Sequence, residues 1–216
     1  MQFVRKLTSW QVRDFLSKYA TDDSQNVLEI GADSTRRNAD IFKNLLTLNI
    51  DPEQKPDVVG DAQDLSFENS SFDVIVCSEV FEHVKDPRKA ALEFKRVLKP
   101  GGLLLLTTRF VFPVHDAPSD FWRFTPYGLQ EIFSDWEIVE EKTEADAFST
   151  IAILLQRIMF QTKLRGGKIT KGLVYLLVLF LNLLDFLVVE RYSDITRKST
   201  VPVLLSSGVF IACRKK

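Results

Sequence analysis

The chain has 216 residues, of which 45% are hydrophobic and 26% charged, and its formal net charge is -1. This composition is typical of a globular protein with one domain and a sizeable insertion, or with two small domains. The balanced charge provides no basic field for nucleic acid, so we expect no nucleic-acid partner.

The two cysteines and the N-terminal stretch indicate a cytoplasmic protein. Cys77 and Cys213 are far apart in apolar runs, so we expect buried, reduced thiols and neither a metal site nor a disulfide. Residues 1–16 lack the unbroken apolar core and the small-residue cleavage site of a signal peptide. Export is therefore not expected.

Helices and apolar strands alternate along the chain. An amphipathic helix is expected over residues 9–20, with Ser9 as its N-cap, and another over 88–98, capped by Asp86 with Pro87 at its first position. Pro100-Gly101-Gly102 is expected to end this second helix. Strands are predicted over 26–32, 45–51, 57–62, 71–80, 103–110, 135–147 and 206–216. Uniformly apolar strands between helices favour a parallel sheet that is covered on both faces.

Polar residues gather where the predicted strands end. Ligand sites of open parallel sheets form at the carboxyl ends of the strands, so these residues are candidates for a site. They are Glu29, Gly31, Ala32 and Asp33; Asn49 and Asp51; Asp61, Ala62 and Asp64; Cys77, Ser78 and Glu79; and Thr107, Thr108 and Arg109.

The chemistry of these residues favours a cationic nucleoside. The turn after the first strand has one glycine, Gly31, whereas a dinucleotide needs a glycine-rich turn for its pyrophosphate. Carboxylates would repel a pyrophosphate but suit a cation that carries a ribose and an amino group. One carboxylate can accept hydrogen bonds from the ribose hydroxyls, and another from an adenine amino group.

The segments VLEIGA, LNIDP, VVGDAQDLSFENSSFDVIVCSEVFEHVKDP and EFKRVLKPGGLLLLTTR resemble the class I S-adenosylmethionine-dependent methyltransferases of the small-molecule type 11 subgroup. The resemblance covers about residues 26–133. It implies an α/β, Rossmann-like, doubly wound sheet of seven mostly parallel strands whose last strand is antiparallel. The final two strands would form a hairpin that is split by an insertion.

The resemblance also assigns roles in binding S-adenosylmethionine. Gly31 would let the backbone approach the methionine part, and Glu29 would order the loop beneath it. The family usually has Asp at the position of Asn49, and Asp51 lies two residues further on the same strand face, so the ribose position stays open between them. The remaining implied contacts are Asp61 and the backbone of Ala62 at the adenine, and Ser78 and Glu79 at the methionine.

One departure from the family pattern concerns Asp33, which replaces the second glycine of the turn. A tight turn there can require a positive φ, which Asp tolerates better than most residues. Residues 34–44 are also too few for a long crossover helix, so only a stub is expected there.

The loop that follows the fifth strand is the candidate acceptor site. His83, expected near the methyl-transfer face, or His115 could act as the base for a hydroxyl or amine acceptor. Alternatively, His83 only bonds to backbone, Arg123 and Asp120 form an internal ion pair, and aromatic residues pin the loop to the core. Thr125-Pro126 should start the next helix. The candidate substrate residues are Asp120, Trp122, Arg123 and Tyr127.

Residues 148–196 form the predicted insertion, and residues 1–147 with 197–216 form the core. The insertion is apolar and helix-forming, with a basic patch at Lys163, Arg165, Lys168 and Lys171. We expect a lid, a hydrophobic acceptor pocket, or a pair of helices lying in a membrane interface. We do not expect a transmembrane span, because the last strand must return to the sheet.

These observations predict a methyltransferase that uses S-adenosylmethionine and acts on a small-molecule, lipid-linked or glycan-linked acceptor. It would be cytoplasmic, with peripheral contact to the inner face of the membrane through residues 148–196. The alternative is a non-catalytic module that keeps the fold and docks on a membrane or a protein through the insertion.

Overall fold

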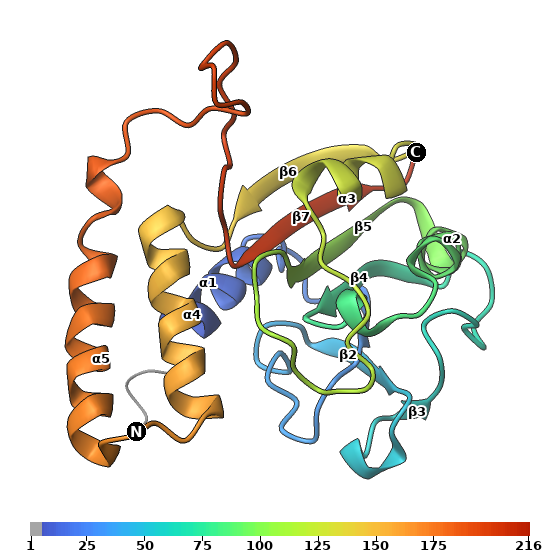
Figure 1. The fold of residues 1–216 in the computed structure, drawn as a ribbon. Helices are drawn as coiled ribbons and strands as arrows, with labels where there is room; N and C mark the ends of the chain where they lie inside the picture. The colour runs from blue at the N-terminus through green and yellow to red at the C-terminus, as the bar shows by residue number, and fades with distance from the viewer. Residues whose placement is uncertain (1–5) are drawn as a thin grey trace. The chain divides into compact units, whose positions relative to one another are not determined.

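The computed structural model describes residues 6–216, which form two compact units (Figure 1). The sheet unit comprises the described residues up to Arg109, together with Asp116–Lys142 and Val209–Lys216. The helical unit comprises Phe110–His115 and Thr143–Gly208. The domain limits of 148 and 196 stay a prediction.

A seven-stranded sheet has the order β3-β2-β1-β4-β5-β7-β6 (Figure 1). β1 pairs in parallel with β2 and β4, β2 with β3, and β4 with β5. The predicted doubly wound, mostly parallel α/β fold is therefore confirmed. The strands are β1 Asn26–Ile30, β2 Asn44–Asn49, β3 Val58–Val59, β4 Phe72–Ser78, β5 Leu98–Arg109, β6 Glu137–Thr143 and β7 Gly208–Arg214.

The last strand runs antiparallel to β5, as predicted. Gly101 N donates to Lys215 O at 3.1 Å, and Lys215 N donates to Gly102 O at 2.9 Å, so the start of β5 lies beside the end of β7. Among the parallel strands, the register places Ile30 beside Leu48 and Cys77. This alignment brings the carboxyl ends of β1, β2 and β4 to one edge of the sheet.

Two of the three helix caps predicted from the sequence are confirmed. Asp86 accepts from Lys89 N at 3.0 Å and caps α2, Pro87–Val97. Thr125 accepts from Gly128 N at 3.0 Å and caps α3, Pro126–Ile132. The predicted cap at Ser9 is wrong, because α1 spans Lys6–Ser17 and Ser9 lies within it.

The core of the sheet unit is built from apolar strand residues and helix faces. Phe15 and Leu16 of α1 pack on one cluster, whose other members are Val27, Phe42, Val74, Val76, Leu105, Phe210 and Ala212. A second group stacks Phe81 between Phe94 of α2 and Phe133, with ring centroids 6.3 and 5.8 Å away. Burial of such large apolar surfaces supplies most of the driving force for folding. Cys77 and Cys213 are buried free thiols, and burial raises the pKa of Cys213 to about 12.

β5 begins earlier than the sequence indicates. Pro100-Gly101-Gly102 lies within the strand Leu98–Arg109 rather than before it. The ladder to β4 shifts register there, since Phe72 pairs with Leu98 and Val74 pairs with Leu103. Tertiary pairing with Lys215, just after β7, holds the glycines in the strand despite their poor strand propensity.

The helical unit contains two helices that pack side by side, α4 Ala147–Gln161 and α5 Gly167–Asn182 (Figure 1). The predicted helical character of this segment is confirmed. A short turn, η3 Asp185–Leu187, follows α5. Asp185 accepts from Phe148 N at 2.8 Å and from Ser149 N at 3.2 Å, so this side chain caps the start of α4.

Candidate functional site

The turn after β1 requires glycine at position 31. Gly31 has φ 74, and a Cβ there would lie 2.2 Å from Val80 Cγ2, which is far inside van der Waals contact. Gly31 N also donates to Leu48 O at 2.7 Å. The backbone at this turn therefore passes directly against β2 and against Val80, which follows β4.

Glu29 places a buried carboxyl group beneath the turn. Its side chain accepts from Asn38 Nδ2 at 2.6 Å through Oε1. Oε2 is buried and has no hydrogen-bond partner within residues 6–216. Burial raises the pKa of Glu29 above its usual value. A buried acceptor of this kind suits a cationic group, which would stabilise the charged carboxylate.

Asn49 ties the end of β2 to the turn. Its Nδ2 donates to Ala32 O at 2.8 Å, and its Oδ1 accepts from Asp51 N at 2.9 Å. Both ends of the amide are therefore engaged with backbone. This geometry leaves Asp51 as the carboxylate nearest the end of β2.

Asp51 and Asp61 hold short turns after β2 and β3. Asp51 accepts from Glu53 N at 2.9 Å and caps the turn η1, Pro52–Gln54. Asp61 accepts from Gln63 N at 2.9 Å, and the next residue, Ala62, is buried. Both carboxylates follow neighbouring parallel strands, and both side chains are ordered by local hydrogen bonds.

The sequence allowed a positive φ at Asp33, but the structure does not have one there. The left-handed residues near the turn are Gly31 and Arg36, with φ 74 and 46. Asp33 instead accepts from Thr35 N at 2.9 Å and forms an ion pair with Arg37. Residues 31–43 contain no helix. The short helix expected in this crossover is therefore not formed.

The end of β4 meets the end of β5 in a polar cluster. Ser78 Oγ lies 3.0 Å from Thr107 Oγ1, and Thr107 Oγ1 donates to Glu79 Oε1 at 3.0 Å. Glu79 also forms an ion pair with Arg109, whose side chain is 8% exposed. Glu79 has φ 59, a conformation that residues other than glycine seldom adopt and that concentrates at functional sites.

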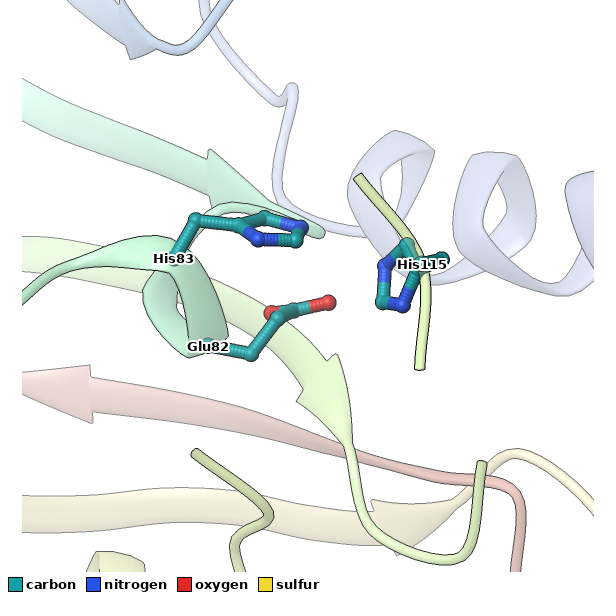
Figure 2. Close-up of side chains that lie close together, drawn as sticks. All are labelled: Glu82, His83 and His115. Atoms are coloured by element: carbon teal, nitrogen blue, oxygen red, sulfur yellow. The ribbon is translucent and has the colours of Figure 1, made fainter. Parts of the chain in front are cut away.

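The turn η2, Phe81–His83, presents Glu82 and His83 (Figure 2). Glu82 is fully buried, accepts from Thr108 Oγ1 at 2.8 Å, and its carbonyl oxygen accepts from Phe121 N and Trp122 N. The backbone carbonyl of Glu82 therefore anchors the acceptor loop, and its carboxylate is bonded to the end of β5. Sequence reasoning placed Arg109, at the end of β5, among the strand-end candidates without giving it a role, and it did not single out Glu82, which follows β4.

His83 is bonded to the backbone of the same loop. Its Nδ1 lies 2.7 Å from Ser119 O. In the neutral ring Nδ1 must carry the hydrogen for this bond, which puts the lone pair on Nε2. His83 is therefore bonded to backbone, as the alternative interpretation of the sequence proposed. The same bond sets the tautomer that a general base at this position would need.

The candidate acceptor residues in the loop are largely engaged with one another. Arg123 and Asp120 form a two-pronged ion pair at 2.6 Å, which is the internal pair that the sequence suggested as an alternative. Trp122 Nε1 donates to Val84 O at 2.9 Å, although the residue is 43% exposed. Tyr127 is 60% exposed on α3.

His115 belongs to the helical unit. Its Nδ1 lies 3.4 Å from Pro113 O, and its ring packs edge-on against Phe112 with centroids 5.3 Å apart. Phe112 in turn lies 4.7 Å from the Arg157 guanidinium of α4. The segment 110–115 is therefore held to α4 by an aromatic and a cation–π contact.

The strand order, the single-glycine turn after β1 and the acidic residues after β2 and β3 define the Rossmann-like class of nucleoside-binding folds. Residues 6–106 match the family described as the methyltransferase domain. This part of the chain is similar to the class I S-adenosylmethionine-dependent small-molecule methyltransferases, a family whose cofactor is S-adenosylmethionine.

Curated relatives and a solved structure agree with this family. The chain is 32% identical over 139 residues to the 2-methyl-6-phytyl-1,4-hydroquinone methyltransferase of Synechocystis sp., covering 56% of this chain and 42% of the relative. It is 34% identical over 98 residues to the ubiquinone/menaquinone biosynthesis C-methyltransferase of Haemophilus ducreyi, covering 42% and 38%. The chain thus spans less than half the length of these relatives.

The solved structure is phosphoethanolamine N-methyltransferase 2 of Haemonchus contortus in complex with S-adenosyl-L-methionine. It matches with a TM-score of 0.57 and 18% identity, covering 96% of this chain and 52% of that one. At this identity the match supports the fold.

Proposed function

We propose that this protein transfers the methyl group of S-adenosylmethionine to a small apolar acceptor of the hydroquinone type. The observation that carries the proposal is the carboxyl edge of β1–β3, where the strand ends carry an obligatory glycine, a buried carboxyl group and two half-buried carboxylates. Bound S-adenosylmethionine would supply a methyl group on a cationic sulfur, ready for in-line displacement.

Each residue at the carboxyl edge of β1–β3 would contact a different part of the cofactor. Gly31 admits the methionine part, and the Oε2 atom of Glu29 accepts from its ammonium group. Asp51 accepts from the ribose hydroxyls, while Asn49 only holds the turn. Asp61 and the backbone N–H of Ala62 hold the adenine. Ser78 and Glu79 line the methionine side.

The acceptor side would use His83 or His115 as the base. The hydrogen bond between His83 Nδ1 and Ser119 O directs proton acceptance to Nε2. Trp122 and Tyr127 expose aromatic surface that suits a ring-shaped acceptor. Asp120 and Arg123 would shape the loop through their ion pair and contact polar groups of the acceptor.

The hydroquinone class is supported by the names of the relatives and by the apolar helical unit. Both curated relatives are named for quinone or hydroquinone substrates. α4 and α5 expose Ile151, Ile158, Leu173 and Leu176, which suit a lipid-tailed molecule. Such an acceptor would be met at the inner face of a membrane by a cytoplasmic enzyme that contacts the surface through residues 148–196.

A radiolabelled-methyl assay tests the proposal. Purified protein is incubated with labelled S-adenosylmethionine and either a lipid extract or a water-soluble extract. We expect label to enter the lipid fraction, and His83→Ala to reduce it. Label that enters only the soluble fraction would overturn the apolar acceptor, and no label in either fraction would overturn methyl transfer.

A non-catalytic docking module is the second candidate. It is favoured by the loop residues Asp120, Trp122 and Arg123, whose polar groups are engaged with other parts of the loop and with Val84. In that case the protein would bind S-adenosylmethionine but give no labelled product with any extract, and the helical unit would serve only for docking on a membrane or protein.

A further inference from the structure

Helix α5 exposes apolar side chains that a soluble domain would bury. Val178 is the only buried residue of the helix. The side chains at helical spacing along its open face, which we call the α5 face, are 45% to 69% exposed; they are Leu173, Leu176, Leu177, Phe180 and Leu183. Surface helices of globular proteins turn polar residues outward, whereas a helix that is apolar all round meets either a core or lipid.

The charge around this face is one-sided. Between Asp146 and Asp185 the chain has five basic residues and no acidic one. Four of them lie at the turn between α4 and α5 and on the first residues of α5, and we call them the basic tip: Lys163, Arg165, Lys168 and Lys171. Apolar surface beside a cluster of cations complements an anionic lipid surface, in which acyl chains lie below negative head groups.

We propose that the basic tip and the α5 face bind the surface of an anionic lipid bilayer. The basic tip contacts the head groups, and the leucine and phenylalanine side chains enter the boundary between head groups and acyl chains. This contact deepens the proposed function, since it names the surface from which an apolar acceptor would be taken. It does not require that methyl transfer occurs.

The geometry of the helical unit favours a helix lying in the interface over one that crosses the membrane. The segment Gly167–Leu187 is long and apolar enough to cross by length and composition. However, α4 and α5 have 15 and 16 residues, or about 22 and 24 Å of helix, against a hydrocarbon core of about 30 Å.

The contacts and charges at the ends of the two helices also argue against a helix pair that crosses the membrane. Asp185, just after α5, is bonded to Phe148 N and Ser149 N at the start of α4, so the outer ends of the pair are held together. A pair that crossed the bilayer would carry the basic tip to the far side, at the cost of moving four cations through hydrocarbon. Lying in the interface keeps all four at the head groups.

Vesicle flotation of the full chain tests this contact. Vesicles are made of phosphatidylcholine alone or mixed with phosphatidylglycerol. The tip variant changes all four basic residues to Gln, and the face variant carries Leu173→Gln, Leu176→Gln and Phe180→Gln. A matched control removes as many charges from exposed lysines of the sheet unit: Lys43, Lys85, Lys89 and Lys216.

We expect wild-type protein to float with the anionic vesicles and to be released by high salt or alkaline carbonate. The tip variant should bind roughly several hundredfold more weakly, since each of the four cations near the surface contributes about a fivefold factor. The face variant should also lose binding, and the control should keep it. Circular dichroism verifies that each variant is folded.

Several results would overturn the contact. Wild-type protein that does not float would do so, as would a control variant that loses as much binding as the tip variant. Protein that stays on the vesicles after carbonate would instead show a spanning helix. A face variant that changes only the oligomeric state would show that the α5 face contacts protein rather than lipid. Titration with S-adenosylhomocysteine in the absence of vesicles is a separate readout, so failure of the lipid contact can be distinguished from failure of the proposed enzyme.

Discussion

Asn49 donates a hydrogen bond from Nδ2 to the carbonyl oxygen of Ala32 at 2.8 Å, joining the end of β2 to the turn after β1. This bond gives Asn49 a structural role at a position where the family usually has Asp. The side chain holds the turn that Gly31 opens, and we propose that the ribose carboxylate is Asp51, two residues along. Cofactor affinity should therefore depend on Asn49 through the turn.

Asn49→Ala should weaken binding of S-adenosylhomocysteine by roughly five- to tenfold, because one hydrogen bond is worth about 1 kcal/mol. Asn49→Asp should weaken it further, since a carboxylate would face the Ala32 carbonyl. Calorimetric titration measures both. Asn44→Ala is the matched control, because Asn44 bonds to Asp23 O at the opposite end of the same strand. If Asn49→Asp binds more tightly than wild type, position 49 contacts the ribose.

Gly31→Ala should abolish measurable cofactor binding. The added Cβ would lie 2.2 Å from Val80 Cγ2, so the turn or Val80 must move. Such overpacking costs about 1–3 kcal/mol of folding free energy in addition to the strain at positive φ. Chemical denaturation and titration measure the two effects.

Gly101→Ala separates the clash from the strain at Gly31. Gly101 has φ 77, close to that of Gly31, but a Cβ there meets no atom within 4 Å. Its substitution should cost only the backbone strain of about 1 kcal/mol and leave binding intact. Adding Val80→Ala to Gly31→Ala should recover part of the stability. Equal losses at both glycines would contradict the assigned role of Val80.

Glu29→Gln should stabilise the fold at neutral pH and weaken the cofactor. Burial raises the pKa of Glu29 above the ordinary 4.5, so ionising this carboxyl destabilises the folded protein as pH rises through its pKa. The unfolding free energy of the variant should therefore equal that of the wild type below pH 4.5, and should exceed it increasingly as pH rises through the raised pKa of Glu29. Denaturation curves across this range measure the difference, with the exposed Glu68→Gln as control. A variant less stable than wild type at neutral pH would contradict the assignment.

His83→Ala should lower kcat by about 100- to 10,000-fold while leaving the affinity for S-adenosylhomocysteine unchanged, as expected for loss of a general base. The same substitution at His115 is the comparison, because these are the two histidines of the chain. Single-turnover assays and titration separate the two parameters. Unchanged turnover in His83→Ala would remove this residue from the chemistry and leave it as an anchor for Ser119.

Sequence patterns predicted the features that depend on neighbouring residues. Asp86-Pro87 and Thr125-Pro126 start helices because side chain, backbone and proline geometry act within three residues. The parallel strands follow from continuous apolar runs. Ser9 carries the same kind of signal, but helical residues precede it, so α1 extends past it.

Features that depend on contacts between residues far apart in the sequence could not be predicted from it. Nothing local indicates that Glu79 pairs with Arg109, since their contact requires the register that aligns the ends of β4 and β5. Burial of Glu82 likewise depends on Thr108 and on the loop that bonds to its carbonyl. The ribose position stayed open between Asn49 and Asp51 because the amide bonds of Asn49 appear only once the turn after β1 lies beside β2.

Calorimetric titration of the purified full chain with S-adenosylmethionine and S-adenosylhomocysteine tests the central claim most directly. We expect both ligands to bind at one site per chain, Asp61→Ala and Asp51→Ala to weaken each of them, and Gly31→Ala to abolish binding. Folded wild-type protein that takes up neither ligand, or binding that is unaffected by all three substitutions, would show that the carboxyl edge of β1–β3 is not an adenosyl site.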